Sequence, residues 1–237
     1  MNPRARTSPA AGVGGNDVSA ALPPVLLMVG SYVLGSLPFG LWVAKAWSGV
    51  DIREVGSGNI GTTNVLRVAG KRAALVVFVL DAGKGAVAVL AAKALAAHGG
   101  YAGGAATALT LGAGAMALLG HTCSIFLGFR GGRGVATGFG VVAAMSWPVG
   151  LSGLAVFVGL AAITRIVSVA SIVSAASMPI FMLAYRQPRP YTVFAALAAV
   201  LVIALHAPNL RRLLRGEESK IGSSRSDSPP GKGHEHE

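Results

Sequence analysis

A glycine-rich segment at residues 56–67, GSGNIGTTNVLR, carries residue types that bind phosphate groups. Its glycines, Gly56, Gly58 and Gly61, allow the backbone to adopt positive φ angles and to approach a ligand closely. Successive backbone N–H groups in such a turn form a concavity that binds anions. Side chains that can donate hydrogen bonds to phosphate oxygens stand among these glycines: Ser57, Asn59, Thr62, Thr63, Asn64 and Arg67. For this segment alone, a plain flexible loop is the alternative.

A second segment at residues 128–137, GFRGGRGVAT, repeats this composition. Gly131, Gly132 and Gly134 flank Arg133 just before a predicted helix, whose N-terminus attracts anions through its free N–H groups and its dipole. A basic membrane anchor is the alternative, and neither segment contains the GxxxxGK[ST] motif of a P-loop. Two such loops on one face predict a site for a molecule with several phosphates or for two phosphorylated substrates.

Two more groups of polar side chains stand near the ends of apolar runs. Arg165, Ser168 and Ser171 open one run, and the two serines share a helix face. His206 and Asn209, at the end of the last run, are also three residues apart, so both can point toward the loops. Helix capping and snorkelling of the arginine explain the first group equally well, and a basic tail on anionic lipid explains the second.

Three ionisable residues lie inside the apolar runs or directly at their ends. Asp81 and Lys84 are three residues apart inside one run, and charges within a membrane are usually paired or functional. We expect them to form a structural ion pair that faces the bundle, with a substrate contact as the alternative. His121 opens the second loop, and we assign it to substrate binding.

Composition places the chain in a membrane. The sequence has 53% hydrophobic and 12% charged residues and a mean hydropathy of +0.62, whereas soluble domains carry about 25% charged residues. The net charge of +11 is distributed in short segments between apolar runs, which argues against nucleic acid and favours anionic lipid headgroups and phosphorylated substrates. The single cysteine, Cys123, excludes an intrachain disulfide, and no metal site or cofactor is expected.

The apolar runs predict an all-α polytopic membrane bundle of about seven helices. A long stretch, 135–163, is divided at Trp147-Pro148, because proline breaks a helix and tryptophan favours the headgroup level. We expect a disordered N-terminal segment at 1–20, a membrane domain at 21–221 and a disordered tail at 222–237. The predicted spans are 22–46, 73–97, 104–120, the two halves of 135–163, 166–185 and 191–206.

Basic residues predict the orientation of these spans, because cytoplasmic loops are rich in lysine and arginine. With seven spans, the alternate loops hold only Arg186 and Arg189 besides the N-terminal arginines. The N-terminus is therefore expected outside, and the C-terminus and both glycine-rich loops in the cytoplasm. The cytoplasmic segments hold Arg53, Arg67, Lys71, Arg72, Arg130, Arg133, Arg165, Arg211, Arg212, Arg215 and Lys220.

Six strings, in order over residues 25–221, resemble the bacterial acyl-phosphate:glycerol-3-phosphate acyltransferases, the PlsY family. They are SYVLGSLPFG, DIREVGSGNIGTTNVLRVAGKR, LDAGKGAVAV, GHTCSIFLGFRGGRGVATGFG, RIVSVASI and LHAPNLRRLLRGEESKIG. The resemblance implies seven membrane helices in the bacterial cytoplasmic membrane with an active site at the cytoplasmic face. It also implies transfer of a fatty acyl group from acyl phosphate to the 1-hydroxyl of sn-glycerol 3-phosphate, giving lysophosphatidic acid and phosphate.

The family's functional residues fall on identifiable positions of this chain. The catalytic positions carried over are Ser57, Arg67, Arg133, His206 and Asn209, and the family's third short motif matches Ser168 and Ser171. The chain departs from the family pattern at three places. Arg133 replaces a frequent lysine, Ser124 replaces the proline of a GHxxP pattern, and Ala207-Pro208 replaces a basic and an acidic residue before Asn209.

Acyl phosphate is already activated, so the enzyme needs no covalent nucleophile, and we expect direct attack by the substrate hydroxyl. Ser57 as a nucleophile is the alternative, although no base lies near it in the sequence.

Two other function classes are less consistent with the chain. A transporter of phosphorylated metabolites predicts inverted repeats, which the sequence does not display. A lipid phosphatase or a CDP-alcohol phosphotransferase needs other motifs, respectively a PSGH-like pattern and spaced aspartates.

Overall fold

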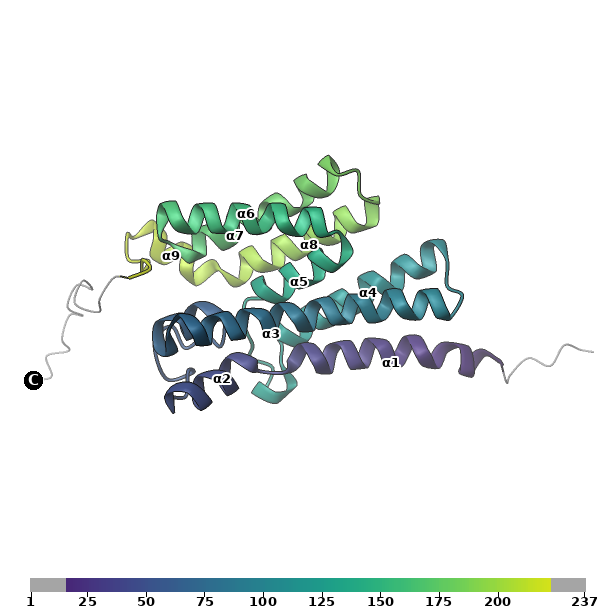
Figure 1. The fold of residues 1–237 in the computed structure, drawn as a ribbon, viewed down its shortest axis with the longest axis horizontal. Coiled ribbons are helices and arrows are strands. Elements are labelled where there is room, and N and C mark those ends of the chain that lie inside the picture. Colours follow the sequence, from purple (N-terminus) through teal and green to yellow (C-terminus); the bar gives the residue numbers. More distant parts are fainter. Residues whose placement is uncertain (1–15, 223–237) are drawn as a thin grey trace, which may run out of the picture.

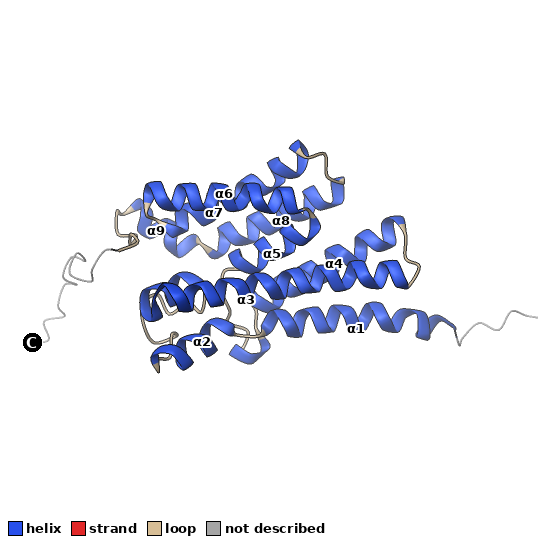
Figure 2. Ribbon diagram, viewed as in Figure 1, coloured by secondary structure: helices blue, strands red, loops and turns tan. Residues whose placement is uncertain are grey.

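The computed structural model describes residues 16–222, and all regular elements among them are helical (Figure 2). They form two groups with one short helix between them (Figure 1). The first group comprises α1 (Asn16–Ser36), α2 (Phe39–Ser48), α3 (Thr62–His98) and α4 (Gly103–Thr122). The second comprises α6 (Trp147–Thr164), α7 (Val167–Ala184), α8 (Arg189–Leu205) and the short α9 (Ala207–Leu214). Between them lies α5 (Val135–Met145), which follows a 3-10 turn, η1 (Ile125–Leu127).

The number of helices long enough to cross a membrane is smaller than the sequence predicted. Among the described residues, five apolar segments are long enough to span a bilayer, and α8 with α9, bent by 57°, makes a sixth. The predicted count of seven included α5, which has 11 residues and is therefore only about 16 Å long at the helical rise of 1.5 Å per residue. That length is about half the thickness of the hydrocarbon core.

Several predicted boundaries also change. The division at Trp147-Pro148 is confirmed, because α5 ends at Met145 and α6 begins at Trp147. The first loop was predicted to reach residue 72, but α3 begins at Thr62 and is kinked at Gly70. The segment 1–20 was expected to be disordered, yet its last residues belong to α1; residues 1–15 and 223–237 lie outside the described part.

The first predicted span is broken at Leu37-Pro38, where α1 gives way to α2. A proline has no N–H to donate, so the carbonyl groups near it lose helical partners. The Lys84 ammonium reaches this break from α3 and donates to the Leu37 carbonyl at 3.0 Å. The same ammonium lies 2.8 Å from the Asp81 carboxylate, and both side chains are almost fully buried. The predicted ion pair is therefore present, and it stabilises a helix break.

The short helix α5 is held closely against α3. Alanine side chains at Gly85 or Gly140 would overlap the carbonyl oxygens of Thr137 and Ala82 respectively, so small residues on both helices permit this approach. The ammonium of Lys93, on α3, donates to the Ala144 carbonyl at 2.6 Å and thereby satisfies the C-terminal end of α5. The contact of Gly85 with Thr137 fixes the start of α5, where the second glycine-rich loop ends, and Lys93 fixes its other end.

The buried ion pair leads to a prediction about stability. Lys84→Met leaves the Asp81 carboxylate without its nearest cation, and removing one partner of a buried pair costs about 3–5 kcal/mol. We expect a clearly lower midpoint of thermal unfolding in detergent. The matched control is Lys71→Met, an exposed lysine on the same helix, which should leave the midpoint unchanged. Equal midpoints for the two variants would contradict the structural role of the pair.

Candidate functional site

A cavity of about 420 Å³ lies between the two groups of helices and is lined by α3, α5, α6, α7 and α8. One end is polar and the other is apolar, which suits a ligand with a polar group at one end and an apolar group at the other. Both glycine-rich loops reach the polar end, so the sequence correctly predicted that they meet. The predicted site residues on the cavity wall are Ser57, Asn59, Gly61, Thr63, Asn64, Arg67, His121, Arg133, Gly134, Ser168, Ser171, His206 and Asn209.

The remaining predicted glycines lie nearby. Gly58 and Gly131 line a neighbouring cavity of about 410 Å³ together with Arg53 and Arg130. Gly56 and Gly132 line neither of these two cavities and instead shape the two loops, as described below.

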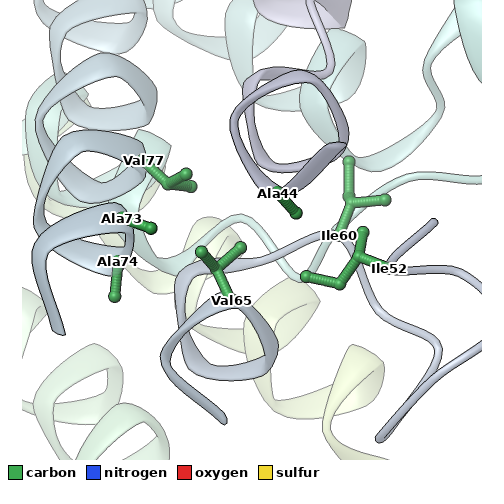
Figure 3. Close-up of a cluster of buried hydrophobic side chains, with 7 residues drawn as sticks. All are labelled: Ala44, Ile52, Ile60, Val65, Ala73, Ala74 and Val77. Carbon is green, nitrogen blue, oxygen red and sulfur yellow. The ribbon is translucent and has the colours of Figure 1, made fainter. Parts of the chain in front are cut away.

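Two isoleucines anchor the first loop, residues 49–61, to the bundle. Ile52 and Ile60 are buried in one apolar cluster with Ala44 of α2 and with Val65 and Val77 of α3 (Figure 3). Because both flanks of the loop are buried in this way, only the segment between them is free to face a ligand. This segment contains Ser57 and Asn59.

Hydrogen bonds from the Asn64 carboxamide set the shape of this segment. Its nitrogen donates to the carbonyls of Ile52 and Val55, both at 3.0 Å. Its oxygen accepts the backbone N–H of Ser57, also at 3.0 Å. Gly56 has a φ of +64°, and a side chain there would overlap the Asn64 oxygen. Asn64 and Gly56, which we predicted to bind substrate, thus hold the loop that presents Ser57.

The second loop is fitted around His121, at the end of α4. The Gly132 N–H donates to the His121 carbonyl at 3.0 Å, and a side chain at Gly132 would overlap the His121 ring. The imidazole in turn lies 3.7 Å from the Asp81 carboxylate. The hydroxyl of Ser124, which replaces the family's proline, donates to the Ser36 carbonyl at 2.6 Å. The loop is therefore fixed by direct contacts with α1 and α4, and His121 of α4 in turn faces α3.

Three helices begin at the polar end of the cavity. Gly61 precedes α3, Gly134 precedes α5, and Ser168 lies in the first turn of α7; all three line the wall. Free N–H groups and the helix dipole make each N-terminus favourable for an anion. The Thr62 hydroxyl, in the first turn of α3, is buried and has no hydrogen-bond partner within residues 16–222. Such a group is available to bind a ligand.

Two arginines on the wall are not neutralised by the protein. In the described part of the chain, neither Arg67 nor Arg133 has a hydrogen-bond or ion-pair partner. Burial lowers the pKa of Arg133, the charges of Arg212 and Arg67 lower it further, and Glu218 opposes them. An arginine remains charged at neutral pH under such shifts. The site therefore carries positive charge that an anionic ligand would balance.

Glu218 is a member of the site that sequence reasoning missed. Its carboxylate accepts hydrogen bonds from Ser168 at 2.8 Å, Asn209 at 2.7 Å and Arg212 at 2.8 Å. Burial raises the pKa of Glu218, but these three hydrogen bonds and the charge of Arg212 together outweigh burial, so the pKa lies below its usual value. Arg165 holds this part of the chain in place, because its guanidinium donates to the Ile221 carbonyl at 2.8 Å.

The bend between α8 and α9 brings His206 and Asn209 to the cavity. Pro208 lies at the start of α9, as expected of a proline that ends the preceding helix. Nδ1 of His206 lies 2.7 Å from the Val202 carbonyl; since a carbonyl only accepts, this nitrogen carries the hydrogen. In the neutral ring Nε2 is then the acceptor. The Asn209 carbonyl oxygen is buried without a partner in the described residues.

Comparison with known proteins identifies the family. The family model for glycerol-3-phosphate acyltransferase matches residues 25–216. The chain belongs to this acyltransferase family. A glycerol-3-phosphate acyltransferase from Synechococcus sp. is 46% identical over 208 residues, covering 88% of this chain and 100% of the relative. One from Rhodospirillum rubrum is 44% identical over 217 residues, covering 90% and 99%.

Solved structures agree. PlsY, described as an integral membrane glycerol 3-phosphate acyltransferase, matches with a TM-score of 0.76 and 38% identity in its glycerol 3-phosphate form. Its lysophosphatidic acid form gives 0.74 and 36%, and each match covers 84% of this chain and 96% of PlsY. The resemblance seen in the sequence is thereby confirmed, and the acyltransferase is a multi-pass integral membrane protein.

The contact between Gly132 and His121 leads to a second prediction. In Gly132→Ala the added methyl would overlap the His121 ring, so the loop that carries Arg133 must move. We expect acyltransferase activity to fall at least about tenfold, as small displacements of positioned groups commonly cause. Gly83→Ala is the control, since Gly83 does not line the cavity and its methyl would meet nothing within 4 Å. If both variants kept full activity, the fit of the loop around His121 would be unimportant.

Proposed function

We propose that this chain transfers a fatty acyl group from acyl phosphate to the 1-hydroxyl of sn-glycerol 3-phosphate, giving lysophosphatidic acid and phosphate. One observation carries the proposal. A single cavity has two arginines without protein partners, Arg67 and Arg133, at its polar end and an apolar wall at its other end. Acyl phosphate has this division of character, and the glycerol 3-phosphate and lysophosphatidic acid forms of PlsY support the choice of acceptor and product.

The polar end offers more than one place for a phosphate. Arg67, Ser57 and the first turn of α3 form one group of donors, and Arg133 with the start of α5 forms another. A guanidinium offers a planar pair of N–H groups that matches two phosphate oxygens. We infer that these two groups hold the phosphates of the donor and the acceptor and bring them together, which converts a bimolecular reaction into a positioned one.

The proposed reaction is a direct acyl transfer. The 1-hydroxyl oxygen attacks the carbonyl carbon of acyl phosphate, the bond between that carbon and the phosphate oxygen breaks, and phosphate leaves with the electron pair. Arg67 and Arg133 stabilise the negative charge that develops on the leaving group and the carbonyl oxygen. No covalent bond to the enzyme is needed, because the mixed anhydride is already activated.

The end of α8 and Glu218 are suited to orient the acceptor. The Nε2 atom of His206 and the Asn209 carbonyl oxygen can accept hydrogen bonds from glycerol hydroxyls, and the ionised Glu218 is a third acceptor beside them. The hydroxyl proton is transferred to a phosphate oxygen of the substrate or to His206. The pH dependence of the rate in His206→Gln distinguishes these two routes. It stays unchanged if His206 only positions the acceptor, and it changes if His206 takes the proton.

We further propose that the site faces the cytoplasm of a bacterium. Counting α5 as a short pass gives seven, with the N-terminus outside and the C-terminus inside, and the ends of the described chain lie at opposite ends of the bundle (Figure 1). The basic residues support this orientation: the segments after α2, α4, α6 and α8, together with the first eleven residues of α3, hold most of them, whereas the turn between α7 and α8 holds Arg186 and precedes Arg189.

A third prediction tests the proposed function. Purified protein in detergent, given acyl phosphate and glycerol 3-phosphate, should release phosphate and form lysophosphatidic acid in equal amounts. Arg67→Ala should lower this rate about 100- to 1000-fold, the usual cost of a well-placed charge donor. Arg72→Ala is the control, an exposed arginine on the same helix that does not line the cavity. No turnover by the unmodified protein, or normal turnover by Arg67→Ala, would contradict the proposal.

A fourth prediction concerns direct attack. If the hydroxyl of glycerol 3-phosphate attacks the donor itself, incubation with acyl phosphate alone should leave the protein mass unchanged. Ser57→Ala should lose activity without a change in this result, because Ser57 then acts only as a hydrogen-bond donor. A mass increase of one acyl group in the unmodified protein, absent in Ser57→Ala, would show a covalent intermediate instead.

A further inference from the structure

The apolar end of the 420 Å³ cavity has a well-defined floor. The residues of α5, α7 and α8 that line the cavity farthest from its polar end are Val142, Met178 and Ala195. All three also belong to one buried apolar cluster, together with Val149 and Met182. The cavity therefore ends against packed side chains.

The depth of the cavity follows from the helices that line it. On α7, Ser168 at the polar end and Met178 at the floor are ten residues apart, which is about 15 Å of helix. On α8, His206 and Ala195 are eleven residues apart, or about 16 Å. Half of a typical hydrocarbon core is also about 15 Å. The cavity is thus as deep as the space that the acyl chains of one leaflet occupy.

The wall between these ends leaves room for an unbranched chain. Ala175 of α7 and Ala198 and Ala199 of α8 line it with single methyl groups. Phe78 of α3 and Phe139 of α5 line it too, and their rings stack at a centroid distance of 5.6 Å. None of these five residues is charged; the Asp81 carboxylate, which also lines the cavity, is paired with Lys84.

Met178 reaches across the floor to α6. Its methyl group packs on Gly153, where any side chain would overlap it. The same two helices are locked there by a hydrogen bond from the Ser174 hydroxyl to the Gly153 carbonyl, at 2.8 Å. Methionine is flexible and fills irregular spaces, so its position depends on the room that Gly153 provides.

We propose that Met178, seated on Gly153, closes the acyl end of the cavity and sets the longest fatty acyl chain that this enzyme transfers. The inference rests on the proposed function, since it assigns the apolar end of the same site to the acyl group of the donor. Each additional methylene beyond the floor has to displace Met178, bend back or turn aside past the exposed wall residues Leu75 and Val158, whereas shorter chains leave the floor untouched.

The structure provides a matched pair of glycines on α6 to test this. In Gly153→Ala the new methyl forces the Met178 methyl away, and Val149 and Met182 pack behind it, so it moves into the cavity and shortens it. In Gly159→Ala the new methyl meets nothing within 4 Å. Met178→Ala removes the floor and lengthens the cavity, and the double variant Gly153→Ala/Met178→Ala should resemble Met178→Ala.

The measurement is kcat/KM for saturated acyl phosphates of stepwise increasing chain length, with glycerol 3-phosphate in excess. One methylene in an apolar pocket changes discrimination by about tenfold or more. We expect Gly153→Ala to shift the ratio of long-chain to short-chain kcat/KM at least about tenfold toward short chains, and Met178→Ala to shift it toward long chains. Gly159→Ala should keep the original profile.

Three results would overturn the inference: an unchanged profile in Gly153→Ala, an unchanged profile in Met178→Ala, or the same shift in Gly159→Ala. The unfolding midpoint of each variant shows that it is folded, and the ratio of rates is independent of the amount of active enzyme. A failure of the proposed function would look different, because the unmodified protein would then transfer no acyl group of any length.

Discussion

The structure depends on positive charge that the protein leaves without an ion-pair partner at the polar end of the cavity, where Arg67 is exposed and Arg133 is half-buried. Arg67 and Arg133 line one cavity without a hydrogen-bond or ion-pair partner among the described residues, and the nearby Glu218 is already engaged by Arg212 and two neutral donors. Cations are costly to place near an apolar interior unless an anion accompanies them. The start of α3, α5 and α7 at the same place adds the positive ends of three helix dipoles. A phosphorylated ligand is the partner that this arrangement favours.

The rest of the fold keeps these charges together. A continuous set of contacts runs from the helix break at Leu37 to the second loop: Lys84 donates to that carbonyl and pairs with Asp81, and Asp81 faces His121, around which Gly132 is fitted. The first loop is fixed by buried isoleucines and by the Asn64 carboxamide. Both loops are partly exposed, and these internal contacts give each of them a defined shape.

Much of the site could be predicted from residue types, and some of it could not. Glycines around a hydroxyl or an arginine, as at Ser57 and Arg133, predict an anion site whatever the fold that surrounds them. Glu218 could not be predicted as a site residue, because a carboxylate in a polar tail belongs to no periodic pattern. The one indication in the sequence was its place in the string RGEESK, after the proline at 208 and shortly before Ile221. The helix break at Leu37-Pro38 was also missed, since the lysine that donates to its free carbonyl, Lys84, lies on another helix.

The most direct test of this account is the unfolding midpoint in detergent, with and without glycerol 3-phosphate, for the unmodified protein and Arg133→Met. A ligand that binds only the folded state raises the midpoint. The account predicts a rise with glycerol 3-phosphate and none with glycerol. Arg133→Met should lose most of that rise while keeping at least the ligand-free midpoint of the unmodified protein, because burial of the charge and its repulsion with Arg212 and Arg67 outweigh its attraction to Glu218. A full rise in Arg133→Met, or an equal rise with glycerol, would contradict it.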